Sequence, residues 1–253
     1  MTTDVRSPEA RLRSPQPAVV RVHDVANVAF VTQTIGVEWT ILHGLPPEDI
    51  RRMLSIARRR TFRKGEVVFH RDDLAESLHL IVKGRFSVCI TTPLGETAML
   101  DVIGPGEAFG ELALLSQGSR RTATIESLDE GETLSVLRED FALLQAEHPG
   151  VKDVLLCLLA EQLARASDRI VEAHYTDAET RVRRRLRDLA LRQGGDGMRP
   201  DISMTQEHLA EMAGTSRATV NRVLRDEERR GTVALSRGHT RILDLEDLSK
   251  RCK

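Results

Sequence analysis

The spacing of hydrophobic residues changes character along the chain. Between residues 61 and 137, short runs of alternating apolar and polar positions are separated by glycines, among them Gly65, Gly84 and Gly95. Short alternating runs with a turn signal roughly every eight to twelve residues are typical of a small β sandwich or barrel. The preceding stretch, ILHGLPPEDIRRMLSIARR, predicts a helix that starts at Pro46–Pro47, with acids in its first turn and arginines in its last.

A second pattern begins at Val151. From there to about Tyr175 the chain contains neither Gly nor Pro and predicts one long helix. Hydrophobic residues recur on it with the seven-residue spacing of a coiled-coil seam. The seam consists of Leu156, Leu159, Leu163, Ala166, Ile170 and Ala173. Packing of this helix on the core of its own β domain could account for half of the apolar positions. Leu155 and Leu158, which lie outside the seam, are placed to make that internal contact and leave the seam free for a partner. We therefore expect the seam to join two copies of the chain in a homodimer.

The last third of the chain reads as helices followed by a hairpin. Asp177 is placed to cap a helix, AETRVRRRLRDLALRQ, that stops at Gly194–Gly195. Two further helices, QEHLAEMAG and RATVNRVLRDEERRG, have Thr205 and Ser216 as N-caps, and the glycine in the turn between them is one that helix-turn-helix units favour. The final GTVALSRGHTRILDL alternates around Arg237–Gly238. This order predicts a winged helix-turn-helix.

These patterns predict an α+β protein, and the 253 residues allow two domains with cores of their own. Residues 1–37 form an N-terminal extension, partly disordered because prolines lie among Ser and Arg. Residues 38–150 form a β-roll, 151–176 the dimerisation helix and 177–250 the winged helix-turn-helix. The net charge of −1 hides a split, since residues 178–253 carry 17 Lys and Arg against 12 Asp and Glu. That excess permits contact with nucleic acid, although an ordinary solvated surface explains it equally well.

The cysteines bear on location and on cofactors. Cys89, Cys157 and Cys252 are widely spaced and form no CxxC, which argues against a zinc site or an iron–sulfur cluster. An odd number of cysteines without a signal peptide indicates the reducing cytoplasm. The longest apolar run, 154–160, is far too short to span a membrane. Oxidant sensing by Cys89 or Cys157 is left open.

Other classes of site find little support. His70 and His79 stand alone on predicted strands, so ordinary surface or core histidines are a simpler interpretation than haem or metal ligands. No Ser/His/Asp or paired-carboxylate arrangement indicates catalysis. We therefore expect a protein that is not an enzyme and holds no metal, haem or iron–sulfur cluster.

One stretch, FGELALLSQGSRRTAT at residues 109–124, groups residues suited to a small anion. An arginine and backbone N–H groups suit a phosphate, and a glycine lets the backbone come close to it. A carboxylate can accept the hydrogen of a ribose hydroxyl. A cyclic nucleotide needs all of these, and Gly110, Glu111, Arg121 and Thr122 supply them. The plainer alternative is a buried Glu–Arg pair that holds a loop to the roll.

The second helix of the helix-turn-helix carries a candidate for base recognition. It presents Arg217, Asn221 and Arg222 in its first turns. In this motif the N-terminal turns of the second helix read the major groove, where arginine donates bidentately to guanine O6 and N7. The expected partner is double-stranded DNA.

From about Trp39 to Leu245 the order of segments resembles the Crp–Fnr family of bacterial regulators. The resemblance is carried by the ILHGL entry helix, the β-roll, the FGEL…RRTAT cassette, the long helix and GTSRATVNRVL. It implies a transcription regulator with cyclic AMP as regulatory ligand and RNA polymerase as a partner. It further implies that Glu111 binds the ribose hydroxyl, while Arg121 neutralises the phosphate together with Thr122 and the backbone of Gly110 and Leu112.

Two positions depart from the family's pattern. The family uses two adjacent hydroxyls of the dimer helix on adenine, and here these positions are Ala166 and Ser167. Ser167 keeps the hydroxyl that acts across the dimer, whereas Ala166 lacks one, so adenine should be held less tightly. Ala218 replaces a glutamate that accepts from cytosine N4, so discrimination at that base pair should fall. The DNA-binding set is Thr205, Ser216, Arg217, Ala218, Asn221 and Arg222.

The expected function is therefore that of a cyclic AMP-responsive regulator that binds inverted-repeat operators as a homodimer. One alternative keeps the fold but binds DNA independently of the nucleotide. Another is a cyclic-nucleotide sensor or buffer with little role on DNA, against which the intact arginine pair argues.

Overall fold

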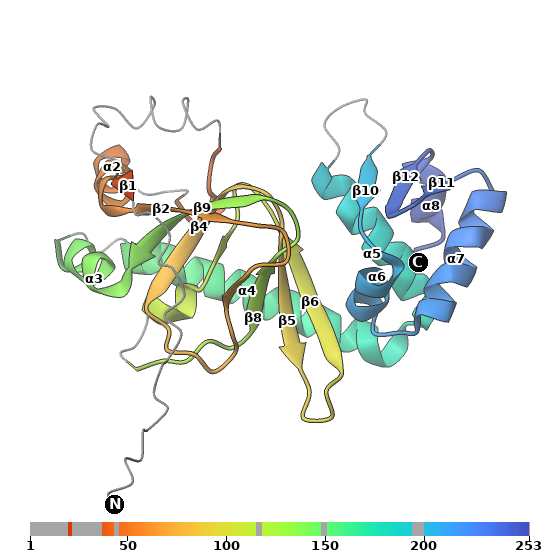
Figure 1. Cartoon of the computed structure of the whole chain (residues 1–253), viewed down its shortest axis with the longest axis horizontal. Coiled ribbons are helices and arrows are strands. Elements are labelled where there is room, and N and C mark those ends of the chain that lie inside the picture. Colours follow the sequence, from red (N-terminus) through yellow and green to blue (C-terminus); the bar gives the residue numbers. More distant parts are fainter. Residues whose placement is uncertain are drawn as a thin grey trace, which may run out of the picture.

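A β-roll, a long helix and a helical C-terminal domain follow one another along the chain (Figure 1). The computed structural model describes residues 20–21, 37–42, 46–114, 118–147, 151–193 and 200–252. The predicted N-terminal extension lies almost entirely outside these ranges. None of the described helices is both long enough and apolar enough to cross a membrane.

The β-roll is built from two antiparallel sheets. One has the order β1-β2-β9-β4-β7, with strands at Val20–Arg21, Arg58–Phe62, Gly131–Leu137, Ser77–Lys83 and Ala108–Phe109. The other has the order β3-β8-β5-β6, with strands at Val67–Phe69, Thr124–Ser127, Phe86–Thr91 and Thr97–Ile103. Both sheets contribute to one core, in which Phe62, Phe86 and Phe109 are buried together. The prediction of short strands in this region is confirmed.

The helix before the roll ends earlier than its sequence suggested. A short 3-10 helix, η1 (Thr40–Leu42), is followed by α2 (Pro47–Ile56), which has two acids in its first turn as predicted. The prediction of arginines in its last turn was wrong, since Arg58–Arg60 lie in β2. Ala57 is already extended, and the arginines pair with β9 from Thr133 to Ser135. The ladder of backbone hydrogen bonds with β9 outweighs the preference of the arginines for a helix end.

The predicted long helix is α4 (Val151–Tyr175), which follows α3 (Arg138–Glu147) and leads into the C-terminal domain (Figure 1). Near its start, Leu155 is buried in the roll's core together with Trp39 and Phe141. Leu155 therefore makes the internal contact expected of it, and this contact fixes the helix on the roll. The surroundings of the Leu158 side chain lie outside the described part of the chain.

The C-terminal domain is a winged helix-turn-helix, as predicted. Its elements are α5 (Ala178–Gln193), β10 (Asp201–Ser203), α6 (Gln206–Ala213), α7 (Arg217–Arg229), β11 (Val233–Ser236), β12 (His239–Ile242) and α8 (Leu245–Lys250). The Thr180 N–H donates to Asp177 Oδ1 (3.0 Å), so Asp177 caps α5. Thr205 and Ser216 cap α6 and α7 through their hydroxyls. The strand β10 and the helix α8 were not predicted.

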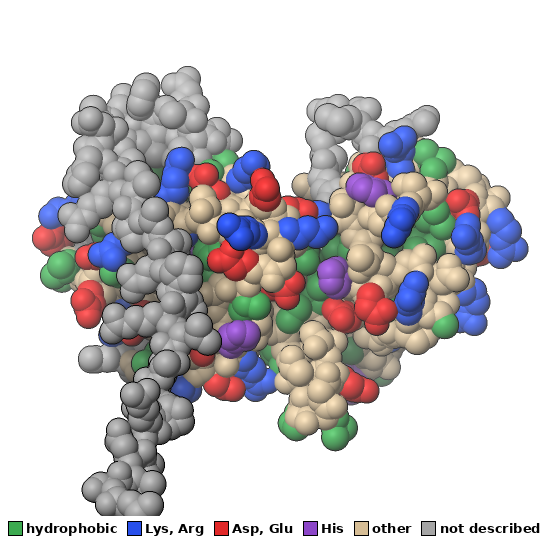
Figure 2. Space-filling model, viewed as in Figure 1, with side chains coloured by type: hydrophobic (Ala, Val, Ile, Leu, Met, Phe, Trp, Pro, Cys, Tyr) green, Lys and Arg blue, Asp and Glu red, His purple; other side chains and the backbone are tan. Residues whose placement is uncertain are grey.

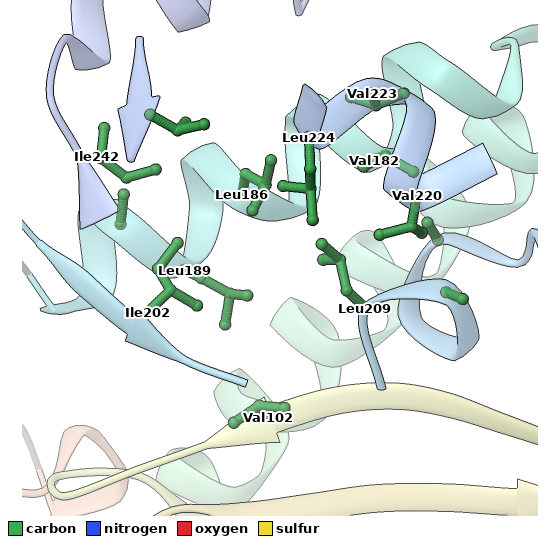
Figure 3. Packing of buried hydrophobic residues seen from close by; sticks show 14 of the residues in the cluster. Val102, Val182, Leu186, Leu189, Ile202, Leu209, Val220, Val223, Leu224 and Ile242 are labelled. Carbon is green, nitrogen blue, oxygen red and sulfur yellow. The ribbon is translucent and has the colours of Figure 1, made fainter. Parts of the chain in front are cut away.

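The hydrophobic core of the C-terminal domain extends onto the roll. Val102 of β6 belongs to the same buried cluster as Leu186, Leu209 and Leu224 (Figure 3). Beside this contact, the Asp101 carboxylate lies 3.3 Å from Arg192 Nη1 of α5 and 2.9 Å from Arg169 Nη2 of α4. One acidic side chain of the roll therefore contacts both the long helix and the C-terminal domain.

A buried carboxylate ties the helices of the C-terminal domain together. Glu227 of α7 is fully buried and accepts hydrogen bonds from Arg183 Nε (2.8 Å), Arg251 Nη2 (2.6 Å) and Thr232 Oγ1 (2.6 Å). Burial alone would raise the pKa of Glu227, but these hydrogen bonds outweigh it and lower the pKa to about 2. Since its partners lie on α5, before β11 and after α8, the carboxylate fixes the orientation of α7.

Replacing Glu227 with Gln should lower the free energy of unfolding by about 3 kcal/mol, because two partly buried arginines, Arg183 and Arg251, lose their buried counter-charge. Urea unfolding followed by helical circular dichroism measures this at pH 7. The pKa is lowered in the folded protein, so the contribution is complete above the unfolded value and disappears as the pH falls toward 2. Glu246→Gln, which removes an exposed partner of Lys250, is the control and should change little. Equal effects of both substitutions would contradict this role of Glu227.

Candidate functional site

The arginine of the cassette is enclosed by the roll. Arg121 is only 6% exposed, and its Nη1 donates to Ser77 O (2.8 Å) and, over a longer distance, to Gly110 O (3.5 Å). Its Nη2 donates to Ser77 Oγ (3.1 Å). The guanidinium carbon lies 3.9 Å from the centroid of the Phe69 ring, a cation–π contact. Burial lowers the pKa of Arg121, and nearby carboxylates, Glu111 first among them, oppose that shift. The group stays charged, because arginine does not lose its proton in proteins.

A glycine is required beside this arginine. Gly110 has a φ of +83°, which favours glycine, and follows β7 directly. A Cβ at this position would lie 2.5 Å from Arg121 Nη1 and 2.8 Å from Ser77 O. Any larger residue would therefore displace the guanidinium group. The glycine that the sequence suggested for close approach to a ligand also makes room for the arginine itself.

The other predicted residues of the cassette lie around this pair. Glu111 is the first residue of η2 (Glu111–Leu114) and is partly exposed. The backbone oxygen of Leu112 accepts a hydrogen bond from Ser119 Oγ (3.4 Å), and Thr122 is exposed directly after the arginine. The structure thus brings Gly110, Glu111 and Arg121 together.

Arg121 retains hydrogen-bonding capacity. Its Nε is buried and donates to none of the groups that the structure describes. A buried N–H without an acceptor is costly, so an anion that reached Nε would remove an energetic penalty as well as gain a charge-assisted hydrogen bond. The arrangement can therefore bind a small anion such as a phosphate.

Several residues of the predicted seam lie on an exposed face of α4. The side chains of Leu156, Leu163 and Ile170 are 61%, 70% and 61% exposed. Ala166 and Ala173 are also exposed, whereas Leu159 is half-buried. Leucines and isoleucines spaced by seven on one open helix face form an apolar stripe that a partner can cover.

Ser167 lies on this face of α4, three residues before Ile170. It is exposed, and its hydroxyl donates to Leu163 O in the preceding turn (3.0 Å). Within the single chain this hydroxyl is not hydrogen-bonded to any described residue of the cassette. Among the described residues, Ser167 is therefore not joined by a hydrogen bond to the group formed by Gly110, Glu111 and Arg121.

The helix α7 presents its first turns outward. Arg217, Ala218, Asn221 and Arg222 are all exposed. Arg222 Nη2 lies 2.8 Å from Glu179 Oε1 of α5, an exposed ion pair that DNA can replace at little cost. The turn before α7 is held by α5 as well, because Arg181 Nε donates to Ala213 O (2.8 Å) and its Nη2 to Gly214 O (3.0 Å).

Cationic side chains accompany α7 and the wing. Exposed arginines continue along α7 to its C-terminal end at Arg225, Arg229 and Arg230, and two more lie in the wing, Arg237 and Arg241. Figure 2 shows blue side chains along the edge of the molecule where α7 lies in Figure 1. Such a face provides the sequence-independent attraction to phosphates on which DNA-binding proteins rely.

Sequence reasoning missed the residues that support Arg121. Ser77 and Phe69 lie on β4 and β3, and Ser77 is 44 positions from the arginine in the chain. His79, interpreted as an ordinary surface or core residue, is buried between the sheets. Burial, and then the charges of Arg121 and Arg60, lower its pKa to about 3. No motif marks these residues, because strand pairing alone brings them to the site.

The structure gives little support to oxidant sensing by a cysteine or to a metal site. Cys89 is half-buried and burial raises the pKa of its thiol, which disfavours the reactive thiolate. The surroundings of the Cys157 side chain lie outside the described part of the chain. Within the described residues, no three His, Cys, Asp or Glu side chains are grouped so that they could hold a metal ion.

Comparison with known families matches both halves of the chain. The family described as "Cyclic nucleotide-binding domain" matches residues 59–148, and "Crp-like helix-turn-helix domain" matches residues 180–251. The chain is 35% identical over 212 residues to the cyclic AMP receptor protein of Thermus thermophilus, covering 83% of this chain and 96% of that protein. It is 30% identical over 216 residues to the CRP-like cAMP-activated global transcriptional regulator of Mycobacterium tuberculosis, covering 84% and 96%.

Solved structures of lower sequence identity share the fold. FixK2 of Bradyrhizobium japonicum superimposes with a TM-score of 0.70 at 19% identity, over 78% of this chain and 98% of that one. The c-di-GMP responsive global regulator CLP of Xanthomonas campestris gives a TM-score of 0.67 at 20% identity, over 78% and 99%. At this level of identity the likeness shows a common architecture and does not identify a ligand.

Proposed function

Because this chain belongs to the Crp–Fnr family of transcription regulators, we propose that cyclic AMP controls its binding, as a homodimer, to inverted-repeat operators. The observation that carries the proposal is the buried charge of Arg121, whose Nε–H has no described acceptor and which lies beside Gly110 and Glu111. RNA polymerase is proposed as a further partner on the basis of the family alone.

The cassette is suited to each polar part of the nucleotide. The cyclic phosphate binds Arg121, with Thr122 and the backbone at Gly110 and Leu112 as additional donors. The ribose 2′-hydroxyl donates to the carboxylate of Glu111, which is partly exposed at the start of η2. A cyclic diester carries one negative charge, so one buried arginine compensates it.

The seam of α4 supplies the remaining contact with the nucleotide. The Ser167 hydroxyl already donates to Leu163 O, so its free lone pairs can accept the exocyclic amino group of adenine from the partner's site without breaking that bond. The neighbouring methyl of Ala166 offers no such acceptor. We therefore propose that adenine is recognised through Ser167 alone and is held less tightly than by two hydroxyls.

Base recognition is assigned to α7. Arg217 and Arg222 lie in its first two turns and are exposed, and the helix caps Ser216 and Thr205 are proposed to contact DNA phosphates. Ala218 offers only a methyl group, which suits a thymine methyl better than cytosine N4. Two copies of α7 related by a two-fold axis would read half-sites about one helical turn apart, ~34 Å.

Replacing Arg121 with Ala should weaken cyclic AMP binding roughly 100-fold, because the phosphate loses its charge-assisted hydrogen bonds. Isothermal titration calorimetry measures the affinity, and Arg120→Ala is the matched control. Arg120 is the exposed neighbour, and its Nη1 donates to Asp72 O (2.7 Å). Equal affinity of wild type and Arg121→Ala would refute the assignment. Tighter binding of c-di-GMP than of cyclic AMP in a parallel titration would replace the proposed ligand with a cyclic dinucleotide.

The double substitution Leu163→Lys and Ile170→Lys should yield monomers that no longer bind operator DNA, since two charges would then lie in the apolar seam. Sedimentation velocity measures the oligomeric state. Leu143→Lys is the control, because this residue of α3 is 69% exposed and lies outside the seam. Unchanged dimers of the double variant would show that α4 does not form the interface.

Arg217→Ala and Arg222→Ala should each cost roughly 1–3 kcal/mol of operator binding and relax the base preference at one position per half-site. Selection from a randomised duplex library, followed by fluorescence anisotropy, gives both quantities. Lys250→Ala on α8 should leave affinity and preference nearly unchanged. An unchanged base preference after both arginine substitutions would move base recognition away from α7.

A further inference from the structure

The guanidinium group of Arg121 is connected to the interior of the roll through two polar side chains. Ser77 Oγ accepts from Arg121 Nη2 (3.1 Å) and lies 3.1 Å from His79 Nε2. The other ring nitrogen of His79, Nδ1, lies 3.0 Å from Thr133 Oγ1 on β9. Four side chains thus form a continuous chain of hydrogen bonds from the cassette into the five-stranded sheet.

Aromatic contacts fix the orientation of His79. Its ring stacks on Phe109, with the centroids 4.9 Å apart and the planes inclined by 4°. Phe69 contacts both ends of the arrangement, because its ring centre lies 6.2 Å from that of His79 and 3.9 Å from the guanidinium carbon of Arg121. The Phe62 ring also lies against the imidazole, with the centroids 6.4 Å apart, so rotation of His79 away from Ser77 would disturb three aromatic side chains.

In this arrangement Arg121 is charged and His79 is neutral, which favours the binding of an anion. Burial lowers the pKa of His79 to about 3, so the imidazole is neutral at physiological pH and adds no second positive charge to repel Arg121. Arginine is only a donor, so Ser77 Oγ must use a lone pair toward it. The end of the guanidinium group bound by Ser77 is therefore held by neutral acceptors, which do not neutralise its charge.

The N–H groups of Arg121 fall into two sets, one that donates to the protein and one that can donate to a ligand. Nη1 and Nη2 donate to Ser77 and Gly110, whereas Nε donates to none of the described residues. Nε–H and a second N–H of Nη2 remain, and such a pair of donors can bind two oxygens of one phosphate group. The protein therefore holds the guanidinium group at the side that faces Ser77, and the side with Nε–H is left to bind the ligand.

We propose that Ser77 and His79 are positioning residues for ligand binding: through Ser77 Oγ, the stacked imidazole holds Arg121 so that its Nε–H is directed to the phosphate of a cyclic nucleotide. The proposal rests on the proposed function for the identity of the ligand. Neither residue touches the nucleotide, so both act only through Arg121. Phe69 completes the arrangement by covering one face of the guanidinium group.

The placement of Arg121 can be tested without a ligand. In proton–nitrogen NMR spectra, the side-chain Nε–H of Arg121, assigned by its loss in Arg121→Lys, should exchange slowly with water in the wild-type protein. Ser77→Ala and His79→Phe should each accelerate this exchange at least about tenfold. Ser77→Ala removes the hydroxyl that accepts from Arg121 Nη2, and His79→Phe removes the imidazole that holds this hydroxyl in place. His79→Phe retains a ring that can stack on Phe109. Exchange rates equal to those of the wild type would overturn the proposal.

The consequence for binding is tested with a double-mutant cycle. Ser77→Ala and His79→Phe should each weaken cyclic AMP binding about tenfold in the wild-type background and leave it unchanged in the Arg121→Ala background. Ser77→Thr keeps the hydroxyl and should restore most of the affinity. Ser87→Ala is the matched control, because Ser87 is a buried serine of β5 whose hydroxyl donates to Glu126 O (3.3 Å). The affinity ratio of cyclic AMP to its 2′-deoxy analogue, which reports on Glu111, should stay constant.

The outcomes separate the two proposals. Equal losses in both backgrounds, or a changed 2′-deoxy ratio, would mean that Ser77 and His79 merely maintain the shape of the pocket, and the positioning role would be wrong. Absence of cyclic AMP binding by the wild-type protein would instead overturn the proposed function. The exchange rates of Arg121 then still decide whether Ser77 and His79 hold the guanidinium group.

Discussion

The need to keep one positive charge inside the β-roll governs the candidate ligand site. Arg121 is almost fully buried, so its charge must be stabilised by nearby groups. Ser77 supplies two acceptors and Phe69 a ring face, while Gly110 leaves the space that the guanidinium group occupies. These contacts are neutral, and among the described residues none accepts a hydrogen bond from Nε. An anion completes the balance of charge and hydrogen bonds, and this is why the roll is suited to a phosphate.

The DNA-binding domain is governed by a second buried charge and by its contact with the roll. Glu227 joins the parts of the domain on either side of α7, so the exposed arginines of that helix project from a rigid support. Asp101 pairs with Arg169 and Arg192 and so links the roll to α4 and α5 at one point. A change in packing along α4 would reach the DNA-binding domain through this carboxylate as well as along the chain, through residues 176 and 177 that join α4 to α5.

Local patterns predicted most of the fold. The caps Asp177, Thr205 and Ser216 and the heptad spacing of α4 act within a few residues of one another, so they can be read from the sequence. The prediction that arginines occupy the last turn of α2 was wrong, because Arg58–Arg60 pair with β9, which is distant in the sequence. The same limit explains why Ser77 was not predicted and why His79 was interpreted as an ordinary surface or core residue. Their relation to Arg121 exists only after strands far apart in the chain have paired.

Control of this regulator by cyclic AMP requires that nucleotide binding and DNA binding are coupled. The coupling is measured as the affinity for an operator, selected from a random library and fluorescently labelled, across a range of cyclic AMP concentrations. We expect this affinity to rise with cyclic AMP and then to saturate. By linkage, bound operator should raise the affinity for cyclic AMP by the same factor. An operator affinity that does not change with cyclic AMP, although calorimetry shows that the nucleotide binds, would rule out this coupling and indicate a regulator that acts on DNA independently of its ligand.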